Sequence, residues 1–397
     1  MPDRNPAQGV PTPMSFNRLG PFYRLQRRLG LLTDTDLAAG RRGVLFIALA
    51  WLPAIALALV QRYALNADHA LLLLFDFSAY AFAIAIGAFV LMEQSSDRRM
   101  AMLVGQFTAR GIVRESAREG IAQARLAMER RTGSGWAELA ILVLAYLISY
   151  TWLSQSAGRI EGGTWFGHSV DGVLQPTLAG WWVLLISLPL YWFLLGRWLW
   201  RFVTWGLLLH DIAKCDLRLV ATHPDRCGGL AFIGQYPKTY MLFVFAESTV
   251  ISATVLKLVV HGGASLMSFK FALLGMLAFF AIAFVLPLFV FAPVLVELKR
   301  KGLAHYGALA SQHNLAFEAK WQAGGEPGER LLGEPDASSL ADLAAGYELV
   351  KNMLAVPLTK ESVAPLILAA LLPMVAVAAT QMPFKDIIGA VKGLILL

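Results

Sequence analysis

The sequence predicts an all-α membrane protein, a polytopic transmembrane helix bundle of about seven spans with a helical cytoplasmic portion. First, it contains seven apolar stretches, each near the ~20 residues that a helix needs to cross a bilayer. Second, 57% of the 397 residues are hydrophobic and 15% are charged, against about 45–50% and 25% in soluble domains. Third, no alternating barrel pattern appears, and helices satisfy their own backbone hydrogen bonds in lipid.

The predicted spans lie near residues 43–61, 70–92, 139–158, 178–196, 239–260, 271–296 and 362–380. Polar segments separate them, and those on one side are long enough to form helices of their own. In chain order we expect a basic N-terminal segment (1–42), membrane helices 1 and 2 (43–92), Arg-rich helices (93–138), membrane helices 3 and 4 (139–196), a basic-aromatic element (197–238), membrane helices 5 and 6 (239–296), a helical hairpin (297–361), membrane helix 7 (362–380) and an amphipathic tail (381–397).

The distribution of Lys and Arg predicts the orientation. The N-terminal segment and segments 93–138, 197–238 and 297–361 hold 28 of them, whereas the three loops on the other side hold one each. Because cytoplasmic loops carry the basic excess, the N-terminus should lie in the cytoplasm and the C-terminus in the periplasm. Pro365 and Pro373 leave open that the last segment turns back. The Ala-, Leu- and Arg-rich composition favours a bacterial inner membrane.

The net charge of +7 is spread over segments that flank apolar runs. This pattern favours anionic phospholipid as a partner and does not indicate nucleic acid. A homo-oligomer and a cytoplasmic protein partner are further expectations. No cofactor is predicted.

Two cytoplasmic segments show helical periodicity. Within 301–321 and again within 340–354, larger residues recur every three or four positions, as on one face of a helix. Ser339 and Asp342 resemble a capping box at the start of the second helix, and Pro357 ends it. The sequence thus predicts an antiparallel hairpin that packs on itself, on the membrane surface or on a neighbouring subunit.

Two Arg-rich stretches, 98–131 and 22–29, also alternate charged and apolar residues. We interpret them as amphipathic helices that lie on the inner membrane surface or, for 98–131, extend from it. Attraction of about 1 kcal/mol per basic residue to anionic lipid would hold them there.

Three charged residues fall within predicted spans, where a charge costs up to about 2.5–3.5 kcal/mol at mid-membrane. Glu247 and Lys257 share the fifth span, so this helix should face protein or water. Glu247 is the stronger candidate for lining a conduit, with a hydrogen bond between helices as the alternative. Lys257 lies near the outer end, where its side chain can reach the interface. Asp76 lies close enough to the outer surface to be hydrated.

Arg197 and Arg201 lie four residues apart after the fourth span and should project from one side of a helix at the inner interface. Lipid phosphate is the expected ligand, and a carboxylate from another subunit is the alternative.

The segment His223-Pro224-Asp225-Arg226-Cys227-Gly228-Gly229-Leu230 predicts a rigid turn, because Pro224 disfavours helix at His223 and the glycine pair allows positive φ. The alternative is an anion site in which backbone amides at Gly228 and Gly229 act beside Arg226 and His223.

Metal binding and catalysis find little support. The candidate zinc ligands are His210, Cys215, His223 and Cys227. Their spacing includes no Cys-x-x-Cys anchor, so no metal site is predicted. Both cysteines fall in a cytoplasmic segment, where thiols stay reduced, so no disulfide is expected. No nucleophile elbow, His-Glu-x-x-His motif or paired carboxylates indicate a catalytic residue.

Several segments resemble a family of bacterial polytopic inner-membrane proteins that has no established function. The resemblance runs from about the fourth span to the C-terminus and implies that the basic-aromatic element and the His-Pro-Asp-Arg turn form one cytoplasmic feature. Where the family commonly has a small residue, this chain has Cys227. The segments are Arg197-Trp198-Leu199-Trp200-Arg201, Asp216-Leu217-Arg218-Leu219 with His223-Pro224-Asp225-Arg226 and Gly228-Gly229-Leu230, and Ser339-Leu340-Ala341-Asp342-Leu343 with Val356-Pro357.

The leading functional hypothesis is an oligomeric channel or transporter-like conduit whose cytoplasmic helices form a vestibule or gate. Glu247 and the prolines of the last two spans favour it, although no selectivity filter or inverted repeat appears. The alternative is a membrane-anchored sensor or scaffold that recruits a partner or reads anionic lipid. The third is a lipid-modifying enzyme in which arginines and His223 handle phosphate, but a non-enzymatic function is preferred.

Overall fold

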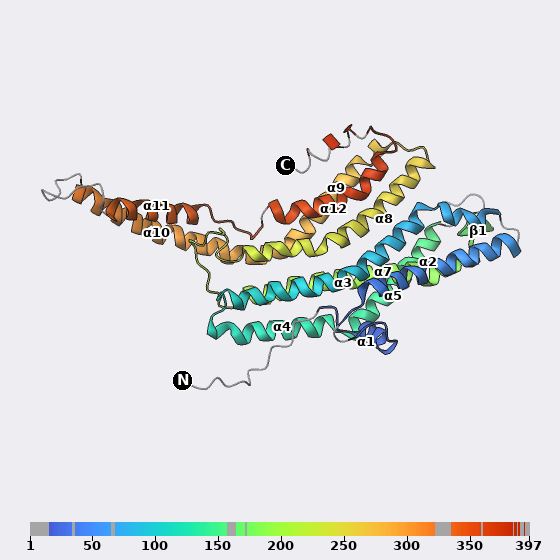
Figure 1. Cartoon of the computed structure of the whole chain (residues 1–397), viewed down its shortest axis with the longest axis horizontal. Helices are drawn as coiled ribbons and strands as arrows, with labels where there is room; N and C mark the ends of the chain where they lie inside the picture. Colours follow the sequence, from blue (N-terminus) through green and yellow to red (C-terminus); the bar gives the residue numbers. More distant parts are fainter. Residues whose placement is uncertain are drawn as a thin grey trace.

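Long helices run along much of the molecule in the computed structural model (Figure 1). The structure describes residues 16–33, 36–64, 68–156, 164–170, 173–321, 335–358, 360–383, 385–386, 388–389 and 393. Within them, seven helical stretches are long and apolar enough to cross a membrane: Ala39–Ala64, Phe77–Ala109, Glu115–Ser154, Leu178–Ala213, Ala231–Val260, Leu266–Trp321 and Glu361–Ala378. Each overlaps one predicted span, so the predicted all-α, multi-pass membrane fold is confirmed.

In the described part of residues 21–156, the chain forms five α-helices and two 3-10 segments. They are α1 (Pro21–Arg28), α2 (Ala39–Ala64), η1 (Asp68–Phe75), α3 (Phe77–Ala109), η2 (Glu115–Ala117), α4 (Arg118–Thr132) and α5 (Gly135–Ser156). A β-hairpin of β1 (Gly167–Val170) and β2 (Val173–Pro176) follows. One long helix then combines α6 (Leu178–Trp182), the π-helical turn η3 (Val183–Ser187) and α7 (Leu188–Ala213).

In the second half, 3-10 segments repeatedly join or precede the helices. The elements are η4 (Ala231–Tyr240), α8 (Met241–Val260), η5 (Leu266–Phe269), α9 (Lys270–Val285), η6 (Leu286–Phe291), α10 (Ala292–Trp321), α11 (Pro335–Lys351) and α12 (Lys360–Ala378). Proline residues lie within η4 and η6, where their missing N–H groups favour departure from regular α-helix.

The central helix of the bundle is α3, which packs against α2, α7 and α8. α12 packs against α8 in turn, while α4 and α5 pack against α7. Aromatic rings fill much of the shared core. The ring of Tyr240, for example, lies 6.1, 5.8 and 4.9 Å from those of Trp198, Phe202 and Phe284, distances at which ring pairs attract each other.

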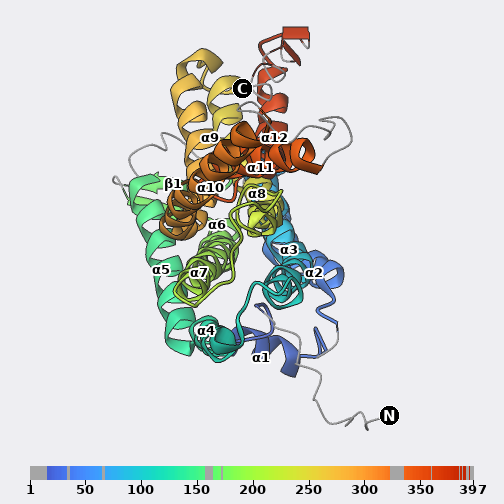
Figure 2. The ribbon, with the colours of Figure 1, turned by 90° about the vertical axis from the view of Figure 1, so that its left-hand side faces the viewer.

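The two ends of the molecule differ. At one end, which we call the basic end, the C-terminal half of α3, α4, the C-terminal half of α7 and the α10–α11 pair extend beyond the predicted spans (left in Figure 1, toward the viewer in Figure 2). The opposite end holds η1, the β-hairpin and the C-terminal ends of α2 and α8. The extensions stay helical because they bury apolar side chains, including Phe107 on α3 and Leu208 on α7.

The predicted helical hairpin is present as α10 and α11, which lie side by side (Figure 1). They are antiparallel, because the Lys320 ammonium pairs with Asp336 at 2.9 Å, whereas Lys299 donates to the Met353 carbonyl at 3.0 Å. The predicted capping box is wrong, because α11 begins at Pro335 and Ser339 lies inside the helix. The helix also ends at Lys351, before Pro357. Residues 322–334, between the two helices, lie outside the described residues.

The β-hairpin was not predicted, and its flank fixes the start of α6. The Thr177 hydroxyl accepts the Gly180 N–H at 3.0 Å, which caps α6, and donates to the Trp165 carbonyl at 2.6 Å. Gly180 also passes so close to the Phe166 carbonyl that a Cβ would collide with it. These contacts tie Trp165 to the start of α6, and its indole N–H donates to Asp76 at the start of α3 at 2.9 Å.

Candidate functional site

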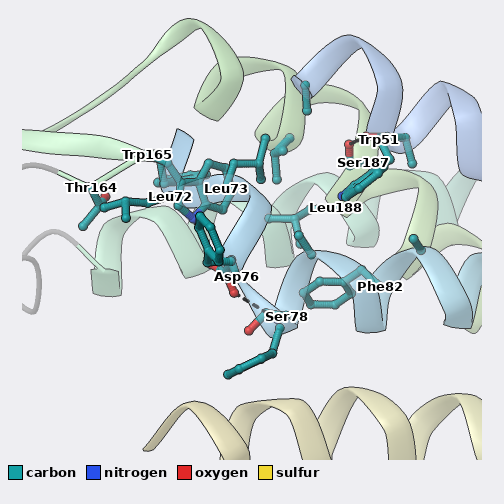
Figure 3. A pocket seen from close by; sticks show the side chains of 18 of the residues that line it. Trp51, Leu72, Leu73, Asp76, Ser78, Phe82, Thr164, Trp165, Ser187 and Leu188 are labelled. Atoms are coloured by element: carbon teal, nitrogen blue, oxygen red, sulfur yellow. Dashed lines mark hydrogen bonds between the residues drawn. The ribbon is translucent and has the colours of Figure 1, made fainter. Parts of the chain in front are cut away.

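A cavity of about 530 Å³ lies at the opposite end, between α2, the start of α3, the segment before β1, and η3 (Figure 3). Its lining is mostly apolar and includes the aromatic side chains of Trp51, Phe82, Trp152 and Trp165. Pockets that bind small molecules commonly have volumes of about 300–1,000 Å³, apolar walls and a few polar groups. The cavity has all three properties and is the candidate functional site.

Charged groups gather at one end of this cavity. Asp76 follows η1 and caps α3, since its Oδ1 accepts the Ser78 N–H at 2.9 Å. Its Oδ2 accepts the indole N–H of Trp165 at 2.9 Å and lies 3.4 Å from the Lys257 ammonium of α8. The Asp76 side chain is 8% exposed and that of Lys257 is 54% exposed. Two of the three predicted intramembrane charges therefore form an ion pair at the cavity rim.

The rest of the cavity follows α3 away from this rim. Asp76, Ala79, Ala83 and Ile86 all line it, so it extends over about 15 Å at 1.5 Å per residue. That is about half of the ~30 Å hydrocarbon thickness of a bilayer. The site is therefore polar at the end of the helix and apolar toward its middle.

The π-helical turn η3 forms another wall, through Val183 and Ser187. Pro189 has no N–H to donate to the Leu185 carbonyl, which interrupts the regular α-helical pattern. The Tyr146 hydroxyl donates to that carbonyl at 3.2 Å, and the Ser187 hydroxyl donates to the Ala50 carbonyl at 2.6 Å. The local distortion thus has a cause in the sequence, and its freed polar groups have partners.

Glu247, the third intramembrane charge, lies one side-chain layer beyond the cavity. Its two carboxylate oxygens are 2.9 and 3.1 Å from the Tyr191 hydroxyl. The Tyr191 ring contacts that of Phe82, which lines the cavity, at 4.8 Å between ring centres. This hydrogen bond joins α8 to α7, and a bond between helices was the expected alternative to a conduit-lining role for Glu247. Across the described chain, no Lys, Arg or His forms an ion pair with Glu247.

Arg197 and Arg201 lie in the interior and pair with carboxylates of the same chain. Arg201 is 3.2 Å from Glu93 of α3, and Arg197 is 3.2 Å from Glu138 of α5. Arg42 of α2 approaches Glu93 at 2.7 Å. All five side chains are at most 8% exposed. In the structure, the partners of Arg197 and Arg201 are therefore carboxylates of the same chain, and not the expected lipid phosphate or a carboxylate of another subunit.

This buried charge cluster (Arg42, Glu93, Glu138, Arg197 and Arg201) also holds the N-terminal helix. The Phe22 N–H donates to Glu138 at 2.7 Å, and the Arg42 Nε donates to the Gln26 side chain at 2.7 Å. The Arg197 guanidinium lies over the Phe22 ring at 4.6 Å, a favourable cation–π distance. The cluster thus ties α1 to α2, α3, α5 and α7.

The His-Pro-Asp-Arg segment forms a rigid turn around Asp225. The Asp225 carboxylate accepts the backbone N–H groups of Cys227, Gly229 and Ala231 at 2.8, 3.1 and 3.1 Å. Burial alone would raise the pKa of Asp225, but these hydrogen bonds and the neighbouring His223 outweigh it and lower the pKa. The amide of Gly229 is therefore occupied by the chain's own carboxylate.

The remaining turn residues dock this segment on the basic end. Arg226 has φ 56° and Gly228 φ 64°, both in the left-handed region. The Arg226 carbonyl accepts the Leu354 N–H at 2.8 Å, and a Cβ on Gly228 would lie 2.9 Å from Leu298. The predicted turn thus contacts α10 and the segment that follows α11, while the Arg226 side chain is exposed.

The described residues contain no group of three or more His, Cys, Asp or Glu side chains that would hold a metal ion. Cys215 and Cys227 are free thiols. Burial, with the neighbouring Asp225 carboxylate, raises the pKa of Cys227 to about 12, which disfavours the thiolate that binds zinc.

The fold and this site define a multi-pass helical membrane protein with an apolar cavity that ends at an ion pair. Comparisons with protein-family models, curated proteins and solved structures found no match. The resemblance to a bacterial membrane-protein family stays an expectation.

Proposed function

We propose that the protein binds a lipid-like amphiphile, with one acyl chain in the cavity and the headgroup at the Asp76–Lys257 rim. The observation that supports this most directly is the change from charged rim to apolar interior along α3. An amphiphile in one leaflet has the same arrangement, with its head at the interface and its chain pointing to the bilayer centre. The ~15 Å length of the cavity matches one leaflet.

The proposal includes an orientation. With 28 basic residues on one side against three on the other, the N-terminus lies in the cytoplasm of a bacterial cell and the C-terminus in the periplasm. The cavity then faces the outer leaflet of the inner membrane. This arrangement is consistent with the sensor hypothesis. Asp76 at the start of α3 and Lys257 of α8 form an ion pair at the rim, so a bound headgroup would change the contact between these two helices.

Native mass spectrometry of the detergent-purified protein with 1-palmitoyl lysophosphatidylglycerol tests the proposal. We expect a complex of one lipid per chain. Ala83 lines the cavity, so Ala83→Phe should fill part of it and lower the occupancy about tenfold, equivalent to ~1.4 kcal/mol. Ala56, which is exposed on α2 and not part of the lining, provides the control Ala56→Phe. Equal binding by the two variants, or no complex with the wild type, would reject the proposal.

An oligomeric conduit is the second candidate, and Glu247 favours it. A carboxyl group inside a membrane-spanning helix is costly and commonly marks an ion or proton path. In the described structure its hydrogen-bond partner is a tyrosine hydroxyl rather than a cation. A homo-oligomer would be needed to enclose a pore, with the α10–α11 hairpins at its cytoplasmic mouth.

Flux in proteoliposomes tests the conduit. Glu247→Gln should reduce proton or cation flux severalfold, whereas Tyr191→Phe, which removes only the hydroxyl partner, should change it less. Absence of flux under both pH and salt gradients would exclude conduction.

A further inference from the structure

Two side chains at the cavity rim retain hydrogen-bond donors that the rest of the described structure does not use. Lys257 and His261 are four residues apart at the end of α8, so both face the same side. Both line the cavity and are exposed. The Lys257 ammonium has three donors, and among the described residues its one partner is Asp76, at 3.4 Å. The His261 ring contacts Phe77 at 5.9 Å, and among the described residues it forms no hydrogen bond.

The acidic group at the rim, in contrast, is already satisfied. Asp76 accepts the Ser78 amide and the Trp165 indole and faces Lys257, and little of it is exposed. It therefore offers little to a cationic headgroup. A negatively charged group approaching the rim would meet Lys257 first.

The C-terminal end of α8 does not prevent an anion from binding at the rim. A helix C-terminus carries partial negative charge on its free carbonyls, but here the carbonyl of Lys257 accepts the His261 N–H at 3.0 Å. The carbonyl of Leu258 accepts the N–H groups of Gly262 and Ala264, both at 3.1 Å. Gly263, with φ 63°, allows this reversal of the chain. The carbonyls of Lys257 and Leu258 thus have donors.

We propose that the cavity selects amphiphiles with an anionic headgroup, phosphate or carboxylate, which Lys257 and His261 bind. The inference rests on the proposed function, because the headgroup is anchored by a chain inside the cavity. Lys257 supplies a charge-assisted hydrogen bond to the anion, and the imidazole of His261 supplies a second N–H donor.

Three ligands with the same palmitoyl chain distinguish the contribution of the headgroup to binding from that of the chain. They are palmitic acid, 1-palmitoyl lysophosphatidic acid and the neutral 1-monopalmitoyl glycerol. In native mass spectrometry the wild type should retain an anionic ligand about tenfold better than the neutral one. Lys257→Gln should remove most of this preference, because it weakens retention of the two acids more than that of the monoglyceride. Lys257→Arg should retain the preference for the anionic ligands, and His261→Gln should weaken this preference partly.

Each outcome decides between the two proposals. A Lys257-dependent preference for the phosphate, the carboxylate or both supports an anionic head and identifies its type. Retention of monoglyceride as good as that of both acids, or a preference unchanged in Lys257→Gln, overturns the headgroup inference and leaves cavity binding in place. If the wild type retains none of the three ligands, the proposed function itself fails. Ala83→Phe serves as the matched chain control, since it should weaken all three alike.

Discussion

At the residue scale, the buried charge cluster brings together side chains that the sequence separates widely. Arg42 directly precedes the first predicted span, Glu93 follows the second, Glu138 precedes the third and Arg197 follows the fourth. All four positions therefore share one depth at the basic side of the membrane. Three guanidinium groups surround two carboxylates there, and each ion is stabilised only while its partners are present.

Glu93→Gln should destabilise the protein strongly. Glu93 faces Arg42, Arg197 and Arg201, and removal of one partner from a buried ion pair typically costs about 3–5 kcal/mol. Thermal unfolding in detergent, followed by tryptophan fluorescence, measures the loss. The exposed Glu119 of α4 gives the control Glu119→Gln, which should unfold at nearly the wild-type temperature. A Glu93→Gln variant as stable as this control would mean that the cluster contributes little to stability.

Asp225 should make stability depend on acid pH. Its pKa is lowered in the folded state, below the ordinary value of about 3.9. The stabilisation is therefore present above pH ~4 and is lost as the pH falls through the lower folded value. Asp225→Asn should cost about 1–3 kcal/mol at neutral pH and flatten the decline in stability below about pH 4.

Unfolding curves across this pH range measure both effects. Asp216, which faces Arg114 at the surface and is 60% exposed, supplies the comparison Asp216→Asn. An identical acid decline in Asp225→Asn and the wild type would contradict the assigned role of Asp225.

At the element scale, hydropathy predicted the spans because apolar length is a local property of the sequence. It did not predict that α3 continues to Ala109 and α7 to Ala213, since those turns depend on partners distant in the chain. The π-helical turn at Pro189 and the β-hairpin also escaped prediction. A proline two residues beyond Ser187 is the signal that could have indicated the interruption.

Two glycines on α10 test how closely the hairpin packs. A Cβ at Gly302 would lie 2.8 Å from Val350 and 2.9 Å from Ala221, whereas one at Gly307 would lie 3.6 Å from Tyr347. Either change to alanine should favour the helix by about 0.5–1 kcal/mol. Gly302→Ala should nonetheless be destabilising overall, because overpacking costs about 1–3 kcal/mol, while Gly307→Ala should stabilise. Thermal unfolding compares them, and equal effects would show that α11 adjusts freely.

At the scale of the whole molecule, α3 connects the three sites that the structure defines. It carries Asp76 at the cavity rim, Phe82 against the Tyr191–Glu247 pair, and Glu93 in the buried charge cluster. The sequence indicated Asp76, Lys257 and Glu247 individually, because a charge in an apolar run is conspicuous. It did not indicate the cavity, whose walls come from segments more than 200 residues apart, from Ala50 to His261. Only packing brings those walls together.

The predicted orientation assigns the basic end to the cytoplasm, and cysteine labelling tests it. After Cys215 and Cys227 are replaced by serine, Ser311→Cys on α10 and Met267→Cys at the opposite end each provide one exposed thiol. In right-side-out vesicles a membrane-impermeant maleimide should label Met267→Cys, and in inverted vesicles it should label Ser311→Cys. The reverse pattern would place the cavity in the cytoplasmic leaflet, so its amphiphile would have to come from the inner side of the membrane.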